Sequence, residues 1–266
     1  MRSPWLWPNL LSLDAPLIAI LWQALLARSF AIPLHPVGRI VLGLTVWVIY
    51  LADRLLDTRA APFPGEPARH LFYRRHFRAA TAMLVIALLA DLGLTLFGLR
   101  PPVFHNGLLA IGGVGLYLAA FHWQPSALRI PKEVAVALLF TVGVFLVAFT
   151  NAQAPLGLLW HPALTFFLLC LANLVAIDSW EWRELRGARP NDASRFVMWL
   201  ARWFPAWTLG LAASTLLASA NSAWYRAVML SLIATLCPFA SGRRLSLEVR
   251  RTFVDAALLT PLFFLW

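Results

Sequence analysis

Charged side chains are scarce in this chain of 266 residues. Asp, Glu, Lys and Arg together make up 13% of it, which is about half of their share in a typical soluble domain. Hydrophobic residues make up 61% of the chain, and its mean hydropathy is +0.72. Long apolar runs with so few charges exclude a single large soluble core and indicate transmembrane helices.

Cysteine and lysine are almost absent. Cys170 and Cys237 both lie inside apolar runs, where we expect small buried hydrophobic side chains rather than a disulfide or a metal site. Lys132 is the only lysine, so arginine supplies 21 of the 22 basic residues behind the formal charge of +10. These arginines stand between the apolar runs, as the positive-inside rule predicts, and we therefore exclude nucleic acid as a partner.

Nine apolar segments are predicted to be transmembrane helices, since a helix needs about 20 residues to cross the hydrocarbon core. Prolines separate most of the segments. The first segment lacks a small-residue cleavage site, so we expect no cleavable signal peptide. The nine segments are 12–33, 38–57, 79–99, 103–123, 133–151, 158–180, 197–219, 222–240 and 251–266. The prediction is an all-α, multi-pass transmembrane bundle that forms one integral membrane domain over residues 1–266.

The basic residues set the predicted orientation. With nine spans, eighteen of the 22 basic residues fall on the side of the N-terminus and four on the other, which predicts a cytoplasmic N-terminus. The thirteen tryptophans, many of them near predicted helix ends, fit an interfacial aromatic belt. We expect an integral protein of a bacterial inner membrane, surrounded by its lipids.

Two groups of acidic residues close predicted helices on the cytoplasmic side. Asp53 and Asp57 end the second segment, and Asp178 and Glu181 end the sixth. Residues three or four apart lie on one face of a helix, about 5–6 Å apart at Cβ, so each pair of carboxylates repels unless a cation neutralises it. Mg²⁺ prefers such oxygens and completes its shell with water and substrate phosphates. The spacing therefore predicts a site for Mg²⁺ and a diphosphate, shared by the two helix ends.

Basic residues beside these acids are candidates to bind the phosphates of a substrate. They are Arg54, Arg129, Lys132 and Arg183. The alternative for Asp53 and Asp57 is an ordinary ion pair at a solvated helix end, which contributes little. The second acidic group, at the matching end of the sixth segment, favours the shared site.

Three further acids lie within apolar segments, where ionisable residues are functional candidates by default. Asp14 stands near the cytoplasmic end of the first segment and is expected to reach the same cavity. Asp91 and Asp255 are expected to be structural. We expect His70, in the basic stretch after the second segment, to be solvated, and Glu184 to pair with the arginines next to it in the sequence.

The combined pattern resembles the UbiA superfamily of intramembrane prenyltransferases over nearly the whole chain. "YLADRLLDTRA" is similar to the first acidic motif of that family, and "IDSWEWRELRG" to the second. "LRIPKEVAVALLFTVGV" is similar to its basic segment after the fourth helix, including a glycine at Gly143. The asparagine of the family's first motif falls at Ile49, and the last aspartate of its second motif falls at Trp182, so Glu181 would take the place of that aspartate.

The resemblance implies a UbiA-like fold and the transfer of an isoprenyl group from an isoprenyl diphosphate to a small-molecule or lipid acceptor, often an aromatic one. It implies that the four carboxylates hold Mg²⁺, while Arg129 and Lys132 stabilise the departing diphosphate. Asp14 or Tyr50 would orient the acceptor.

Three alternatives to this function remain open. One is a non-catalytic UbiA-like membrane protein. Another is a transporter with an acidic vestibule facing the cytoplasm, although transporters more often place polar groups at mid-bilayer. The last is a CDP-alcohol phosphotransferase, whose acidic motif needs a glycine that "ADRLLDTRA" lacks.

Overall fold

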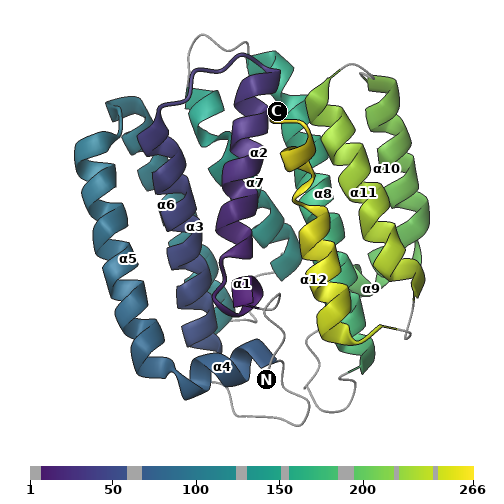
Figure 1. Ribbon diagram of the computed structural model, residues 1–266, viewed down its shortest axis with the longest axis horizontal. Helices are drawn as coiled ribbons and strands as arrows, with labels where there is room; N and C mark the ends of the chain where they lie inside the picture. Colours follow the sequence, from purple (N-terminus) through teal and green to yellow (C-terminus); the bar gives the residue numbers. More distant parts are fainter. Residues whose placement is uncertain are drawn as a thin grey trace.

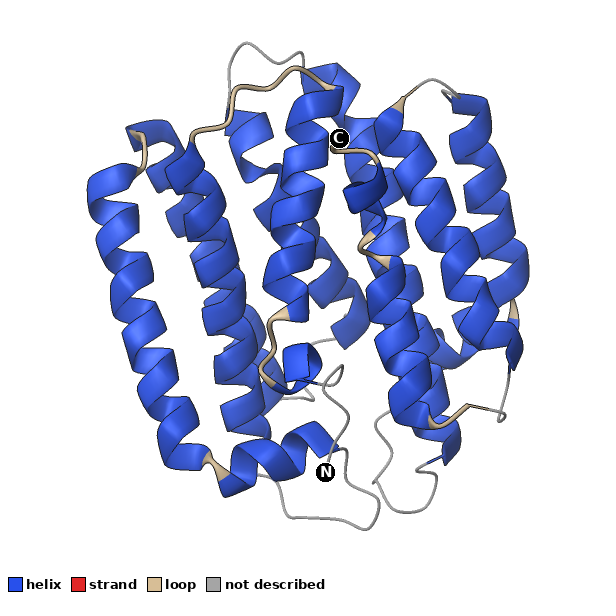
Figure 2. Ribbon diagram, in the orientation of Figure 1, coloured by secondary structure: helices blue, strands red, loops and turns tan. Residues whose placement is uncertain are grey.

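The computed structural model describes residues 7–58, 68–123, 131–150, 156–184, 195–218, 222–241 and 245–266. Every regular element in these residues is helical, which confirms the predicted all-α class (Figure 2). The elements are α1 (Trp7–Leu10), α2 (Asp14–Ser29), α3 (Pro36–Asp57), α4 (Ala68–Arg75), α5 (Phe77–Gly98), α6 (Pro101–Trp123), α7 (Lys132–Thr150), α8 (Leu156–Glu184), α9 (Arg195–Arg202), α10 (Phe204–Ala218), α11 (Ala223–Ser241), α12 (Leu247–Ala257) and the 3₁₀ turn η3 (Thr260–Phe263).

Five of the described helices are long and apolar enough to cross a membrane, which supports an integral membrane protein. They are α5, α6, α7, α8 and α11. The remaining predicted segments correspond to α2, α3, α10 and α12, which contain 16, 22, 15 and 11 residues. The count of nine spans therefore stays a prediction.

Two of the predicted segments are interrupted at prolines. The seventh, 197–219, is not one helix, because α9 ends at Arg202 and α10 begins at Phe204. Pro205 has no N–H to donate to the carbonyl group four residues earlier, and it disfavours helical backbone in the residue before it. The ninth segment, 251–266, contains α12 up to Ala257 and then the separate turn η3 around Pro261. The short helices α1 and α4 were not predicted.

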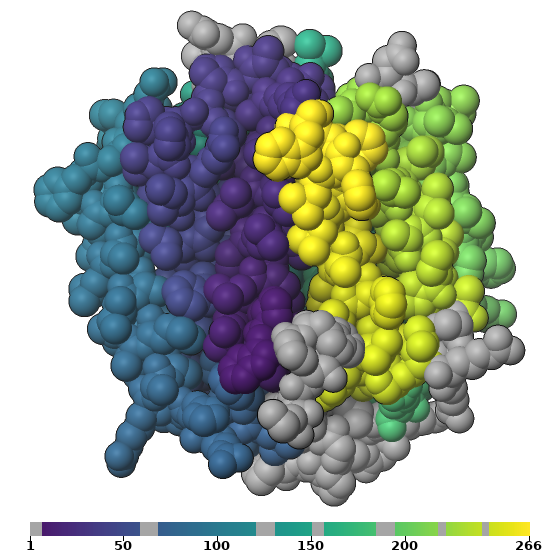
Figure 3. All heavy atoms as spheres, viewed as in Figure 1, coloured from purple at the N-terminus to yellow at the C-terminus, as the bar shows by residue number. Residues whose placement is uncertain are grey.

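The main core lies between α2, α7, α8 and α11, with Trp22 of α2 at its centre. The Trp22 ring centroid is 5.0 Å from that of Phe166 on α8 and 5.1 Å from that of Trp224 on α11. Its Nε1 donates a hydrogen bond to the Leu258 carbonyl oxygen at 2.9 Å. Aromatic side chains bury large apolar areas, so this one residue joins α2 to α8, to α11 and to the end of α12. The C-terminal segment lies beside α2 on the face shown in Figure 3.

The consecutive helices α5 and α6 pack on different partners. α5 lies along α3, and α6 lies along α7. Both helices keep many large apolar side chains exposed, as expected of helices that face lipid. A polar link crosses the α3–α5 contact, where Thr45 Oγ1 donates to Asp91 Oδ2 at 2.8 Å. This hydrogen bond is consistent with the structural role expected for Asp91.

Candidate functional site

Charged and polar residues gather at one end of the bundle, where α3 and α8 end and α2, α7 and α12 begin (Figure 1). α4 lies across the same end. Because these helices run in opposite directions, the ends of α3 and α8 meet the starts of α2 and α7, whereas Arg251 and Asp255 lie further along α12. The group termed the charged cluster consists of Asp14, Asp53, Arg54, Asp57, Arg69, His70, Lys132, Glu133, Asp178, Glu181, Arg251 and Asp255.

Arg54 lies between the two acids of α3. Its Nη1 is 3.5 Å from Asp57 Oδ2 and 4.0 Å from Asp53 Oδ2. Asp57 Oδ2 is also 3.9 Å from Nε2 of His70 on α4. His70 is buried, so the expectation that it is solvated is wrong. Lys132 Nζ, at the start of α7, lies 4.0 Å from Asp53 Oδ1 and links α7 to α3.

Asp178 reaches the cluster from α8. Its carboxyl group is close enough to that of Glu133 to share a hydrogen bond, and Lys132 lies within electrostatic reach of it. Glu133 is only 6% exposed, and its Oε2 has no hydrogen-bonding partner among the described residues. Two carboxyl groups in contact need a proton or a cation between them, since two like charges at this separation repel. Lys132 connects this pair with Asp53, so the acids that end α3 and α8 belong to one cluster.

Sequence reasoning did not single out Glu133. It stands in the first turn of α7, where acidic residues are common because they interact favourably with the helix dipole. The sequence around Glu133 therefore does not distinguish a metal ligand from a glutamate that only interacts with the helix dipole.

Glu181 is paired differently from Asp178. Its Oε1 contacts the guanidinium group of Arg251 on α12 and lies 3.4 Å from Arg69 Nη2 on α4. Burial, together with the nearby charge of Arg54, lowers the pKa of Arg69 to about 9, so Arg69 is still a cation at neutral pH. Glu181 therefore lies between two cations.

Asp14 and Asp255 form a third acidic group in the cluster. Asn9 Nδ2 donates to Asp14 Oδ2 at 2.9 Å and lies 3.3 Å from Asp255 Oδ2. Asn173 Nδ2, from α8, lies 3.4 Å from Asp255 Oδ1. Tyr50 lies within electrostatic reach of both acids. Asp255, expected to be structural, lies beside Asp14 and Tyr50, the two residues predicted for the acceptor side.

The remaining predicted residues do not join the cluster. Arg183 is exposed and lies within electrostatic reach of Arg250. Glu184 contacts Arg250, an arginine distant in the sequence, and the neighbouring Arg186 and Arg189 lie outside the described residues. Arg129 lies outside the described residues. Within the described part of the chain, no three or more His, Cys, Asp or Glu side chains are arranged to hold a metal ion, so the carboxyl groups occur as pairs.

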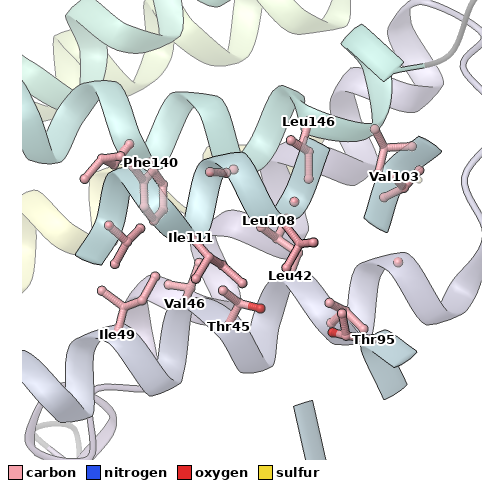
Figure 4. Close-up of a pocket in the computed structure, with 18 of the residues that line it drawn as sticks. Leu42, Thr45, Val46, Ile49, Thr95, Val103, Leu108, Ile111, Phe140 and Leu146 are labelled. Atoms are coloured by element: carbon pink, nitrogen blue, oxygen red, sulfur yellow. The ribbon is translucent and has the colours of Figure 1, made fainter. Parts of the chain in front are cut away.

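An apolar cavity of about 150 Å³ lies between α3, α6 and α7 (Figure 4). Leu42, Val46 and Ile49 of α3 and Leu108 and Ile111 of α6 are gathered around it. Most lining side chains are aliphatic or aromatic, with Gln23, Thr45 and Thr95 as polar exceptions, and such a lining is typical of sites for apolar ligands.

The cavity begins beside the charged cluster and extends away from it. Tyr50 and Tyr117 line its near end, and Tyr117 lies within electrostatic reach of Asp53 and Asp178. Gly38 of α3 lines the far end. Gly38 and Tyr50 are twelve residues apart on one helix, which corresponds to about 18 Å. An apolar cavity whose lining residues are spread over this stretch of α3, with charged groups at one end, suits an amphiphile with a charged head.

One wall of the cavity is open to the surroundings. Leu108 and Ile111 line the cavity, yet they are 51% and 50% exposed. Gly107 of α6 also lines it, and a Cβ placed there would meet Leu146 Cδ2 at 3.8 Å. At Gly115 of the same helix, a Cβ would meet nothing within 4 Å. The cavity therefore opens along α6, beside the exposed Leu108 and Ile111.

Comparison of the chain with protein-family models, with curated proteins and with solved structures finds no match. The arrangement of its side chains is thus the basis for a functional assignment.

Proposed function

We propose that this protein is a membrane prenyltransferase, a divergent member of the UbiA superfamily that transfers an isoprenyl group from an isoprenyl diphosphate to an acceptor in the presence of Mg²⁺. The observation that carries this proposal is the apolar cavity that ends at the charged cluster. The cavity suits an isoprenyl chain, and the cluster supplies both carboxylates for cations and basic groups for phosphate oxygens. The similarity of the acidic and basic motifs to those of the UbiA superfamily favours the same function.

The acidic residues of the cluster fit Mg²⁺, because this ion prefers hard oxygen ligands and their side chains supply carboxylate oxygens. Asp53 and Asp57 would hold one ion from α3, and Asp178 would hold another from α8. The sequence motifs assign Glu181 as a fourth group, but in the structure its Oε1 is paired with Arg69 and Arg251. Mg²⁺ is usually bound through one or two carboxylates together with water and substrate phosphates, so pairs of carboxyl groups suffice. Asp178 lies within hydrogen-bonding reach of Glu133, whose Oε2 has no donor among the described residues, and this arrangement also fits a site for a cation. When bound, Mg²⁺ supplies positive charge that neutralises the diphosphate leaving group.

The chain's own residues would bind and orient the two substrates. Lys132 and Arg54 lie among the carboxylates, where they would donate hydrogen bonds to phosphate oxygens. The C–O bond of the isoprenyl diphosphate breaks with its electron pair going to the diphosphate. The apolar cavity walls would exclude water from the allylic carbon, and Asp14 and Tyr50 would orient the acceptor that forms the new bond and then loses a proton.

The test is diphosphate release from labelled isoprenyl diphosphates by the purified protein in lipid nanodiscs with Mg²⁺. We expect the wild type to release diphosphate, and Asp53→Asn and Asp178→Asn to reduce the rate by roughly 100-fold. Asp91→Asn is the matched control, because Asp91 is a buried acid outside the cluster. Its rate should stay close to that of the wild type. Failure of the wild type to cleave any chain length would favour the non-catalytic or transporter alternatives.

A further inference from the structure

We propose that Glu133 of α7, and not Glu181, forms with Asp178 the second carboxylate pair that binds the cation. This assignment rests on the proposed function, which supplies the identity of the cation and of the diphosphate. It gives Glu181 a different role, which is to hold α4 and α12 to α8.

The first reason is the surroundings of Glu133. Its carboxyl group lies within hydrogen-bonding reach of that of Asp178, is buried, and receives no hydrogen bond at Oε2 from the described residues. A buried carboxylate without a partner is unfavourable, and a second carboxylate beside it adds repulsion. A divalent cation between Glu133 and Asp178 removes both penalties at once.

The second reason is the surroundings of Glu181. Its Oε1 already contacts Arg251 and lies 3.4 Å from Arg69 Nη2. If Glu181 turned to a metal ion, these two buried guanidinium groups would lose the anion that they contact and would keep only acids within electrostatic reach, such as Asp255. This loss is unfavourable in a poorly solvated place. Its existing partners therefore keep Glu181 away from a metal.

The third reason is the balance of charge. The charged cluster contains seven acidic side chains, four basic side chains and His70. The acids are Asp14, Asp53, Asp57, Glu133, Asp178, Glu181 and Asp255, and the basic residues are Arg54, Arg69, Lys132 and Arg251. The acids therefore outnumber the basic groups, and a divalent cation reduces this excess of like charge. Two of the four basic groups, Arg69 and Arg251, contact Glu181.

The experiment measures Mn²⁺ binding as a stand-in for Mg²⁺, by electron paramagnetic resonance, with and without inorganic diphosphate. Because no isoprenyl substrate is present, the result is independent of turnover. Glu133→Gln is expected to weaken Mn²⁺ binding at least about tenfold, the smallest loss typical of disturbed metal sites. Glu248→Gln is the matched control, because Glu248 is an exposed glutamate of α12. It should bind Mn²⁺ as the wild type does.

Glu181 is tested with two variants, since Glu181→Gln alone leaves two arginines without their anion. Glu181→Gln and the double variant Glu181→Gln with Arg251→Gln are both expected to keep wild-type Mn²⁺ affinity whenever they are folded. The assignment would be overturned if the double variant bound Mn²⁺ more weakly than the wild type while Glu133→Gln bound it normally. It would also be overturned if the double variant and Glu133→Gln lost Mn²⁺ affinity equally. A wild type that binds no Mn²⁺ under either condition would overturn it too. A wild type that binds Mn²⁺ through Glu133 but cleaves no isoprenyl diphosphate would refute the proposed function and leave the metal site standing.

Discussion

Replacing Glu181 by glutamine is expected to destabilise the protein strongly. Glu181 is the anion shared by Arg69 of α4 and Arg251 of α12, and the side chains of the three residues are mostly buried. Removing one partner of a buried ion pair costs roughly 3–5 kcal/mol, because the remaining charge stays desolvated and unpaired. Two guanidinium groups lose their contacting anion here, while Asp255 stays within electrostatic reach of both, so we expect a loss within that range.

The size of the effect can be followed by thermal unfolding, with the fluorescence of the thirteen tryptophans as the signal. A change of about 1 kcal/mol shifts the Tm of a chain of this size by roughly 2–4 °C. The expected decrease in Tm for Glu181→Gln is therefore on the order of 10 °C in a fixed detergent.

Glu133→Gln is the informative comparison, because it makes the same chemical change to another buried glutamate of the cluster. It removes one of two carboxyl groups in contact, so without metal its Tm should equal or exceed that of the wild type. Glu248→Gln, at an exposed position of α12, should change stability by no more than about 1 kcal/mol. A Glu181→Gln protein with the Tm of the wild type, or a Glu133→Gln protein that loses as much as Glu181→Gln, would refute this assignment of roles.

Three other outcomes are expected. Gly107→Phe should fill the cavity and raise the KM for an isoprenyl diphosphate, whereas Gly115→Phe, which points into open space on the same helix, should not; equal effects would show that the chain binds elsewhere. Trp22→Phe should lower stability by about 1–3 kcal/mol, since the buried Leu258 carbonyl loses its donor, and an unchanged thermal unfolding curve would contradict this. A reporter active only in the cytoplasm should be silent when fused after Trp266, because the C-terminus lies at the end opposite α4 and the charged cluster; an active fusion would reverse the predicted orientation.

The sequence predicted helices best where an apolar run of membrane length has charged or proline-rich flanks. The described bounds of α5, α7 and α11 lie within two residues of the predicted ones. Pro205 lies inside an apolar run, and hydropathy gives no sign of the break between α9 and α10. Local backbone chemistry decides the structure there, because a missing N–H interrupts a helix whatever the polarity of its side chains.

Helix spacing could place two acids on one face, but it could not choose their partners. It grouped Asp53 with Asp57, and the structure brings them into one cluster with Asp178 through Lys132. It gave no reason to connect Glu133 with Asp178, which is 45 positions later in the chain. Contacts of that kind depend on how helices pack, and a single sequence does not report this.

The open wall beside α6 determines which part of a ligand can supply its affinity. A chain that enters the cavity past Leu108 and Ile111 comes from hydrocarbon, not from water. Lipid tails are as apolar as the cavity lining, so this transfer gains no hydrophobic free energy. Chains of different length would then differ in affinity through shape and fit alone, and most of the binding energy would have to come from the head group at the charged cluster. A phospholipid tail competes for the same space. The affinity of an isoprenyl chain for this site is therefore measured relative to the tails of the surrounding lipids.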